Sequence, residues 1–274
     1  MKAASFDYVR PGEVAEALAA LGRAAGSAKL LAGGQSLAPM LNLRLARPRL
    51  LIDVSRLTAL QLMEDRGSAW RIGAGVTHAR LEDARLAGAP MLSAVAGGIA
   101  YRAVRNRGTI GGSLAHADPA ADWPTALAAL GAAVNIVSPR GPRAMPVEEL
   151  IEGAFATGLE DDELIETIDV PKLSSGGRFG HYKFSRKTGD FAEASAAALF
   201  DPARGIARIF LGAMRARPQP LDALAERVAR EGAWTATPEK VAAALAQAVP
   251  DLDAVERRMA SAVVTRALQQ VGKP

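Results

Sequence analysis

Two short segments that pair glycines with hydroxyl side chains lie far apart in this chain, and they constrain it more than any other feature. They are Ala32-Gly33-Gly34-Gln35-Ser36 and Thr109-Ile110-Gly111-Gly112-Ser113. A glycine pair lets the backbone approach an anion closely, because no Cβ stands between the amide N–H groups and the anion. One such segment is common in proteins. Two in one chain predict a ligand with two linked phosphates, such as a dinucleotide.

Each segment also has a purely structural explanation. The first follows a short predicted strand, residues 29–31, and precedes a short predicted helix near Leu37. The amides of Gly33 to Leu37 and the Ser36 hydroxyl would surround a phosphate at the start of that helix. The alternative is a tight strand–helix turn that needs glycine for a positive φ. For the second segment the alternative is a buried bend, and the two segments together favour the dinucleotide.

A third glycine-bearing stretch tests for the nicotinamide type of dinucleotide fold. Residues 73–78, Gly73-Ala74-Gly75-Val76-Thr77-His78, follow a predicted strand and precede a predicted helix that Thr77 could cap. His78 stands where the Rossmann fingerprint requires its third glycine. No acidic residue is evident at the end of a following second strand. The sequence therefore disfavours a Rossmann site.

Composition excludes several other classes of protein. The chain has 274 residues, of which 49% are hydrophobic, so it can bury one large core or two medium ones. Its net charge of +4 is carried by dispersed arginines, which disfavours nucleic-acid binding. No apolar run approaches the roughly 18 residues of a membrane span. The N-terminal residues lack the apolar core of a secretory signal, and we expect a cytoplasmic protein.

Cysteine is absent, so this chain cannot hold an iron–sulfur cluster, a thiolate zinc site, a cysteine nucleophile or a disulfide. The three histidines, His78, His116 and His181, share no ligand spacing. We therefore expect no metal site and no catalytic residue of this chain's own.

The pattern of elements changes near Ser174-Ser175-Gly176-Gly177, which marks the expected domain boundary. Before it, helices and strands alternate, including one alanine-rich helix predicted over residues 89–104. After it come three predicted strands, at 179–185, 192–200 and 206–214. Three helices follow, at about 219–231, 238–248 and 252–271. A strand meander followed by a helical bundle is typical of an α+β domain.

Three charged residues are candidates for contacts beyond the phosphates. Asp118 and Asp122 follow the second segment and could serve acid–base chemistry or a cation, or could cap the turn at Pro119 and the helix near Pro124. A carboxylate there could instead accept hydrogen bonds from sugar or ribityl hydroxyls, which we favour for Asp122. Lys183 lies on a predicted strand end, where a cation discourages strand association or stabilises a reduced ring system.

At this point the residues resemble a known family, the medium, FAD-binding subunits of molybdenum hydroxylases, typified by carbon monoxide dehydrogenase and related to the flavin domain of xanthine dehydrogenase. The resemblance extends over essentially the whole chain, and its most specific string is residues 105–114, Arg105-Asn106-Arg107-Gly108-Thr109-Ile110-Gly111-Gly112-Ser113-Leu114. Further matches are Phe6-Asp7-Tyr8, residues 31–37, Leu51-Ile52-Asp53-Val54, residues 72–75, Asp118-Pro119-Ala120-Ala121-Asp122, Tyr182-Lys183-Phe184 and Asp190-Phe191-Ala192. Gln35 departs from the histidine of many members.

The resemblance implies an α+β fold. Residues 1–174 would form a two-part FAD-binding domain of the PCMH/vanillyl-alcohol-oxidase type. Residues 175–274 would form a smaller C-terminal domain of the carbon monoxide dehydrogenase flavoprotein type, with a three-stranded antiparallel sheet and a helical bundle.

The resemblance also implies noncovalently bound FAD and a set of residues around it. The pyrophosphate would lie against both glycine segments, Asp122 would accept hydroxyl hydrogen bonds, Lys183 would lie near the cofactor, and Ile99 and Ile165 would pack on its rings. The full set is Leu31, Ala32, Gly33, Gly34, Gln35, Ser36, Leu37, Ile99, Thr109, Ile110, Gly111, Gly112, Ser113, Asp122, Ile165 and Lys183.

Two partner subunits follow from the same resemblance. A large molybdenum-cofactor subunit would oxidise the substrate, and a small subunit with two-iron two-sulfur clusters would carry electrons to FAD, in a dimer of heterotrimers. FAD would then pass them to quinone, NAD or oxygen. The competing hypotheses are a stand-alone flavin oxidase or reductase with its own substrate pocket, and a non-catalytic nucleotide-binding module.

Overall fold

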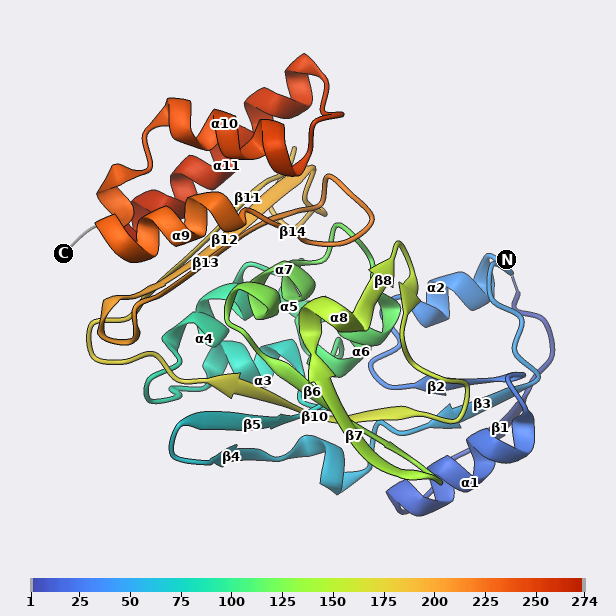
Figure 1. Cartoon of the computed structure of the whole chain (residues 1–274). Helices are drawn as coiled ribbons and strands as arrows, with labels where there is room; N and C mark the ends of the chain where they lie inside the picture. Colours follow the sequence, from blue (N-terminus) through green and yellow to red (C-terminus); the bar gives the residue numbers. More distant parts are fainter. Residues whose placement is uncertain (1, 273–274) are drawn as a thin grey trace.

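A small parallel sheet forms the first part of the computed structural model, which describes residues 2–272 (Figure 1). Its strands, in the order β1-β3-β2, are β1 (Asp7–Val9), β2 (Ala28–Leu31) and β3 (Leu50–Asp53). Helix α1 (Val14–Ala24) buries Ala17 and Leu21 in one apolar cluster with Ile52 of β3. The short helix α2 (Leu37–Asn42) follows β2 after the first glycine segment. The carboxyl ends of β2 and β3 therefore lie side by side.

A five-stranded antiparallel sheet forms the second part of the same half. Its order is β4-β5-β10-β6-β7, with β4 (Met63–Asp65), β5 (Ala69–Gly73), β6 (Ala133–Ser138), β7 (Gly141–Pro146) and β10 (Leu164–Pro171). The helices beside it are α3 (His78–Asp83), α4 (Pro90–Gly97), α5 (Arg102–Arg105), α6 (Ile110–His116), α7 (Asp122–Ala129) and α8 (Val147–Leu150). The remaining short elements are η1 (Thr58–Gln61), β8 (Ile151–Gly153) and β9 (Ala156–Thr157). Trp123 lies in the core between these helices and the sheet, fully shielded from solvent.

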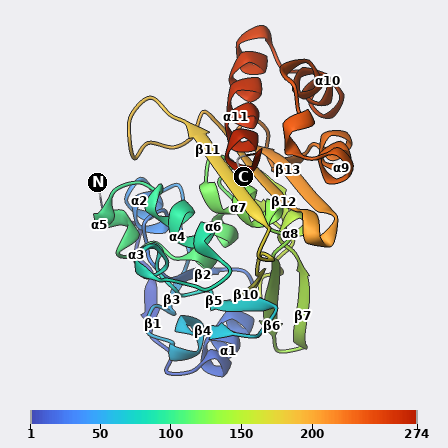
Figure 2. The same cartoon turned by 90° about the vertical axis from the view of Figure 1, so that its left-hand side faces the viewer.

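The C-terminal part is a second antiparallel sheet with helices on its outer face (Figures 1 and 2). Its strands are β11 (Arg178–Phe184), β12 (Ala194–Asp201), β13 (Ile206–Gly212) and β14 (Gln219–Pro220), with η2 (Pro202–Arg204) in the β12–β13 turn. Its helical elements are α9 (Asp222–Glu231), η3 (Ala233–Thr235), α10 (Pro238–Ala248) and α11 (Ala254–Gly272). Helix α7 of the first half packs on the inner face. Every residue of β12 is buried, and its small alanines let helices approach from both sides.

The structure corrects one element expected from the sequence and adds detail to two others. The single helix expected over residues 89–104 is two helices, because Ala100 takes a left-handed φ of 42° between them. Arg105 stabilises that break by donating from Nη1 to the carbonyls of Ile99 and Ala100 at 2.8 and 2.9 Å. The three C-terminal strands are present, and the short β14 adds a fourth. Most of the second glycine segment is the first turn of α6, with Thr109 as its N-cap.

Gly212 is the tightest point between α7 and the C-terminal sheet. A Cβ there would lie 2.0 Å from Oγ1 of Thr125 and 2.6 Å from Oγ of Ser195. We expect Gly212→Ala to lower the free energy of unfolding by about 1–3 kcal/mol through overpacking. Adding Thr125→Ala, which removes the atom that clashes most, should restore much of the loss. Urea unfolding of both single variants and the double variant measures this, and strict additivity would contradict the assigned contact.

Candidate cofactor-binding site

The first glycine segment is in direct contact with the turn immediately before the second one. A Cβ on Gly33 would lie 2.0 Å from the carbonyl oxygen of Arg107 and 2.9 Å from Cα of Gly108, so only glycine fits. The Arg107 Nε donates across the same contact to the Gly33 carbonyl at 3.4 Å. Gly112 lies beside Ala32, since a Cβ built on Gly112 would be 3.9 Å from the Ala32 Cβ. Two segments that are distant in sequence therefore form one surface.

The first segment presents free backbone donors. Gly34 has a left-handed φ of 72°, which turns the chain from β2 into α2. Two carbonyls of the segment accept hydrogen bonds. Ala38 N donates to the Gly34 carbonyl, and Met40 N donates to the Ser36 carbonyl. Among the residues the structure describes, the amides of residues 33–37 have no acceptor. These N–H groups are available to an anion. That they bind phosphate stays a prediction.

The second segment uses its amides differently. Ile110 N donates to Val76 O at 3.1 Å, Gly111 N to Ala74 O at 3.0 Å, and Gly112 N to the Thr109 side chain at 3.1 Å. A Cβ on Gly111 would lie 2.4 Å from the Cβ of Ala74, so this glycine serves close packing. The second segment is therefore anchored to residues 74–76 and supports the first segment. It also contributes Thr109, the N-cap of α6, to the shared surface.

A cavity of about 280 Å³ opens at this junction. Its lining residues are Ala32, Gly33, Ser55, Arg56, Gln61, Gly75, Thr77, Arg80, Asn106, Arg107 and Thr109. Three arginines face it and no carboxylate residue lines it, which makes it suited to an anion. Ser55, Arg56 and Arg80 line this cavity but were not predicted from the sequence. Parallel pairing of β2 with β3 was the available signal for the first two, because the carboxyl ends of parallel strands meet at one edge.

His78 explains why the third glycine stretch does not follow the Rossmann fingerprint. Its ring packs directly on Gly108, where a Cβ would lie 2.9 Å from Nε2. Its Nδ1 accepts a hydrogen bond from Nε1 of the buried Trp123 at 3.1 Å. Burial, reinforced by the nearby Arg105 charge, lowers the pKa of His78 to about 4. The imidazole is therefore a neutral packing group beneath the second segment at neutral pH.

Asp53 fixes the rim of the cavity at the end of β3. Its Oδ1 accepts from Ser55 N at 2.9 Å, and its Oδ2 accepts from the Tyr8 hydroxyl and from Arg10 Nε at 3.1 Å. Burial opposes ionisation of this carboxyl, but the hydrogen bonds from Ser55, Tyr8 and Arg10 outweigh it and lower its pKa to about 2. An ionised Asp53 thus holds the turn that presents Ser55 and Arg56.

Asp122 and Lys183 form an ion pair away from the cavity lining. The Lys183 Nζ lies 2.9 Å from Oδ2 of Asp122, which is the first residue of α7 and is 7% exposed. The N-cap of α7 is Ala121, and Asp122 lies inside the helix, so the capping alternative does not describe Asp122. Asp118 does support the turn at Pro119, where its Oδ1 accepts from Ala120 N at 2.9 Å.

The two expected ring-packing residues lie in or beside the core. Ile165 of β10 is 5% exposed and pairs with Ile136 of β6. Ile99 is half-buried against the same cluster, next to the break at Ala100. Neither residue lines the cavity. Their contact with flavin rings stays a prediction.

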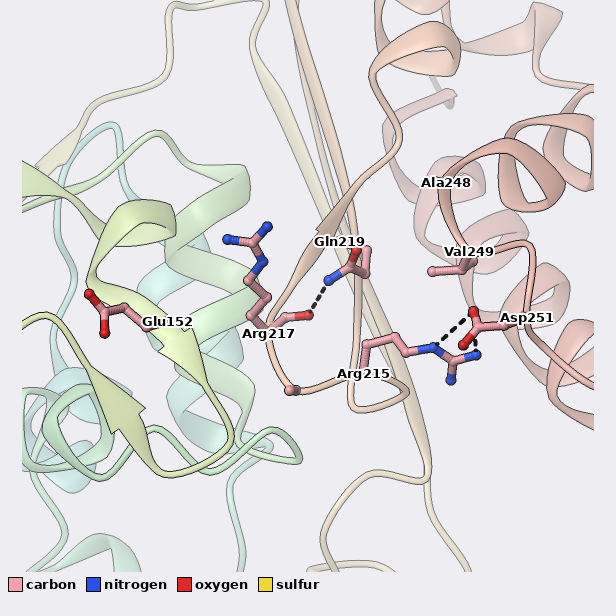
Figure 3. Close-up of a pocket in the computed structure, with 8 residues that line it drawn as sticks. Glu152, Arg215, Arg217, Gln219, Ala248, Val249 and Asp251 are labelled. Carbon is pink, nitrogen blue, oxygen red and sulfur yellow. Dashed lines mark hydrogen bonds and ion pairs between the residues drawn. The ribbon is translucent and has the colours of Figure 1, made fainter.

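A second cavity, of about 290 Å³, has a different electrostatic character (Figure 3). Its lining residues are Glu152, Arg215, Ala216, Arg217, Gln219, Ala248, Val249 and Asp251. Arg215 Nη2 is paired with Asp251 at 2.9 Å, and Glu152 adds a further acid. Its charges are therefore balanced internally, which leaves the arginine-lined cavity as the better anion site.

Known proteins match this chain over most of its length. Residues 4–173 match the family described as the FAD binding domain in molybdopterin dehydrogenase. The chain is 43% identical over 201 residues to the 6-hydroxypseudooxynicotine dehydrogenase complex subunit alpha of Paenarthrobacter nicotinovorans, covering 73% of this chain and 68% of that protein. It is 41% identical over 194 residues to the carbon monoxide dehydrogenase medium chain of Hydrogenophaga pseudoflava, covering 70% and 68%.

A solved structure extends the similarity to nearly the whole chain. Reconstituted CO dehydrogenase from Oligotropha carboxidovorans matches with a TM-score of 0.92 and 31% identity, covering 99% of both chains. The chain therefore belongs to the family of FAD-binding medium subunits of molybdenum hydroxylases, and it is an oxidoreductase subunit with an FAD-binding domain. This confirms the resemblance and the fold class given by the sequence.

Within residues 2–272, no helix combines the length and the apolar character needed to cross a membrane. In the same part of the chain, no group of three or more acidic or histidine side chains could hold a metal ion.

We expect Asp53→Asn to lower the free energy of unfolding by about 1–2 kcal/mol near neutral pH. The folded pKa is about 2 against an ordinary value of 3.8, so the stabilisation is complete above pH 3.8 and is lost as the pH falls toward 2. The difference in the free energy of unfolding between wild type and variant should therefore disappear as the pH falls from 3.8 toward 2. Urea unfolding at several pH values measures it, with the exposed Asp7→Asn as control. A gap that is constant with pH would contradict the assignment.

Proposed function

We propose that this chain is the electron-transfer subunit of a multi-subunit molybdenum dehydrogenase. It would receive electrons from two-iron two-sulfur clusters of a small partner subunit, reduced in turn by a large molybdenum-cofactor subunit, and pass them to a terminal acceptor. When bound, FAD supplies the one- and two-electron redox chemistry. The chain's own residues bind the cofactor, orient it and exclude water from it.

The observation that carries the proposal is the junction of the two glycine segments. Gly33 leaves no room for a side chain against Arg107, the amides of residues 33–37 are free donors among the described residues, and three arginines face the same cavity. A diphosphate needs this combination of close backbone approach, N–H donors and positive charge. The residues present therefore fit the cofactor of the family.

The remaining site assignments are proposals that rest on this junction. Residues 31–37 and 109–113 would hold the pyrophosphate of FAD. Asp122 would accept hydrogen bonds from hydroxyls of the cofactor, and Lys183 would lie near its ring system. Ile99 and Ile165 would pack on the rings. Because Asp122 and Lys183 lie outside the cavity lining, these contacts require the cofactor to extend from the cavity toward α7 and β11.

The need for partners follows from the chemistry that this chain cannot supply. It has no cysteine to ligate an iron–sulfur cluster, so a cluster must be carried by another subunit. Matched relatives are named as a complex subunit and as medium chains of dehydrogenases. We propose a large molybdenum subunit and a small iron–sulfur subunit, assembled as a dimer of heterotrimers.

Gly33→Ala tests the phosphate cradle. The added methyl group would displace Arg107, so we expect FAD affinity to fall at least about tenfold, as for the loss of one or more charge-assisted hydrogen bonds. Riboflavin, which lacks phosphates, should bind the variant and the wild type about equally. Fluorescence titration of apoprotein measures both, and Gly22→Ala, at an exposed helix position with open space for a Cβ, is the control. Equal losses for FAD and riboflavin would place the phosphates elsewhere.

The electron-transfer role is tested on the assembled enzyme. Affinity-tagged chain isolated from its own cells should carry about one FAD per chain and co-purify with molybdenum and iron. Rapid-mixing spectroscopy with a reductant of the molybdenum subunit should show the clusters reduced before the flavin absorbance bleaches. Oxidation of an organic substrate by the isolated chain alone would instead support the stand-alone flavoenzyme.

A further inference from the structure

A buried polar cluster joins α7 to the inner face of the C-terminal sheet. We define the Asp122 cluster as Asp122, Lys183 and His181. Lys183 Nζ lies 2.9 Å from Oδ2 of Asp122, and His181 Nε2 lies 3.6 Å from Oδ1 of the same carboxylate. His181 and Lys183 are two positions apart on β11, so their side chains lie on one face of the strand.

The backbone of His181 is held in place from the other side of the sheet. Gln270 of α11 accepts from the His181 amide and donates to the His181 carbonyl, both at 3.1 Å. Beside it, a Cβ on Gly180 would lie 2.1 Å from the Ala267 carbonyl, so β11 lies directly against α11. The backbone of His181 therefore has little freedom, which fixes the point on β11 from which its side chain extends.

Two atoms of the cluster face each other unpaired. Asp122 Oδ1 and His181 Nε2 are both buried, and neither has a hydrogen-bond partner among the described residues. A buried polar atom left unpaired destabilises the folded protein. A hydrogen bond between the two atoms satisfies both, and it requires a movement of less than about 1 Å.

The charges around His181 favour a neutral ring. Burial lowers the pKa of His181, the Asp122 carboxylate on α7 opposes this, and Lys183 on the same strand reinforces it. Helix α11 contributes the neutral Gln270, and its Arg266 is bonded to the Tyr182 hydroxyl. Helix α4 and the face of β12 carry no charge here. A neutral ring can donate to Asp122 only with its proton on Nε2.

We propose that His181 is a positioning residue of the flavin site, donating from Nε2–H to Asp122 Oδ1 and so fixing which way the carboxylate faces Lys183. The proposal rests on the proposed function, in which Asp122 and Lys183 contact the bound FAD. With Oδ1 taken by His181, Lys183 is left with Oδ2 alone. Without His181 the carboxylate turns so that both oxygens reach Lys183, which draws the ammonium group away from the cofactor.

The tautomer can be tested without any cofactor. Apoprotein labelled with ¹⁵N-histidine contains three imidazoles, which single His→Gln variants assign. The long-range ¹H–¹⁵N spectrum should show His181 neutral and protonated on Nε2 near neutral pH. A charged ring, or a proton on Nδ1, would overturn the proposal. This readout does not depend on whether FAD binds.

The effect on the cofactor is tested with two variants at the same position. We expect His181→Ala to weaken FAD binding about tenfold, the loss of one hydrogen bond to a charged group, and to shift the flavin midpoint potential. His181→Gln retains an N–H donor and should stay within about twofold of wild type. His116→Gln, outside the cluster, is the control. If the alanine and glutamine variants lost FAD affinity equally while their thermal stability was unchanged, the donor role of His181 would be overturned. Failure of wild-type protein to bind FAD would count against the proposed function instead.

Discussion

The close approach of Gly33 to the Arg107 carbonyl is the constraint on which the rest of the site depends. It joins the end of β2 to the turn before α6, and a side chain at position 33 would force these elements apart. Because β3 pairs with β2, the same contact brings Ser55 and Arg56 to the cavity. Because His78 packs under Gly108, the contact between Gly33 and Arg107 also fixes the start of α3. One steric requirement thus sets the position of several elements.

The two sides of the proposed site differ in how their charges are balanced. Arginines around the cavity lack a facing carboxylate, so the positive potential is left for a ligand to neutralise. Asp122, by contrast, already has Lys183 at 2.9 Å and is shielded from water. A diphosphate suits the first environment, and neutral hydroxyls suit the second, where an added charge would be costly to bury. This division matches the chemical polarity of FAD along its length.

Local sequence signals were enough to locate one part of the proposed site. Glycine pairs, a strand before them and a helix after them were enough to locate the free amides of residues 33–37. The break at Ala100 escaped prediction because alanine favours helix, and the break depends on Arg105 bonding back to Ile99. The amides of residues 110–113 also gave no local signal, because their acceptors include Ala74 and Val76, which are distant in sequence. The helix break and the bonding of these amides depend on contacts that local propensity does not report.

The boundary expected near residue 174 does not separate the proposed site from the C-terminal domain. Helix α7 presents Asp122, but the partners of that carboxylate, Lys183 and His181, come from β11. The small residues of β12 allow this, because alanine on both faces lets α7 approach the sheet from inside and α11 from outside. Larger side chains there would hold α7 away from the sheet and separate Asp122 from Lys183. The packing of the C-terminal domain against α7 therefore helps to form the cofactor site proposed for the FAD-binding domain.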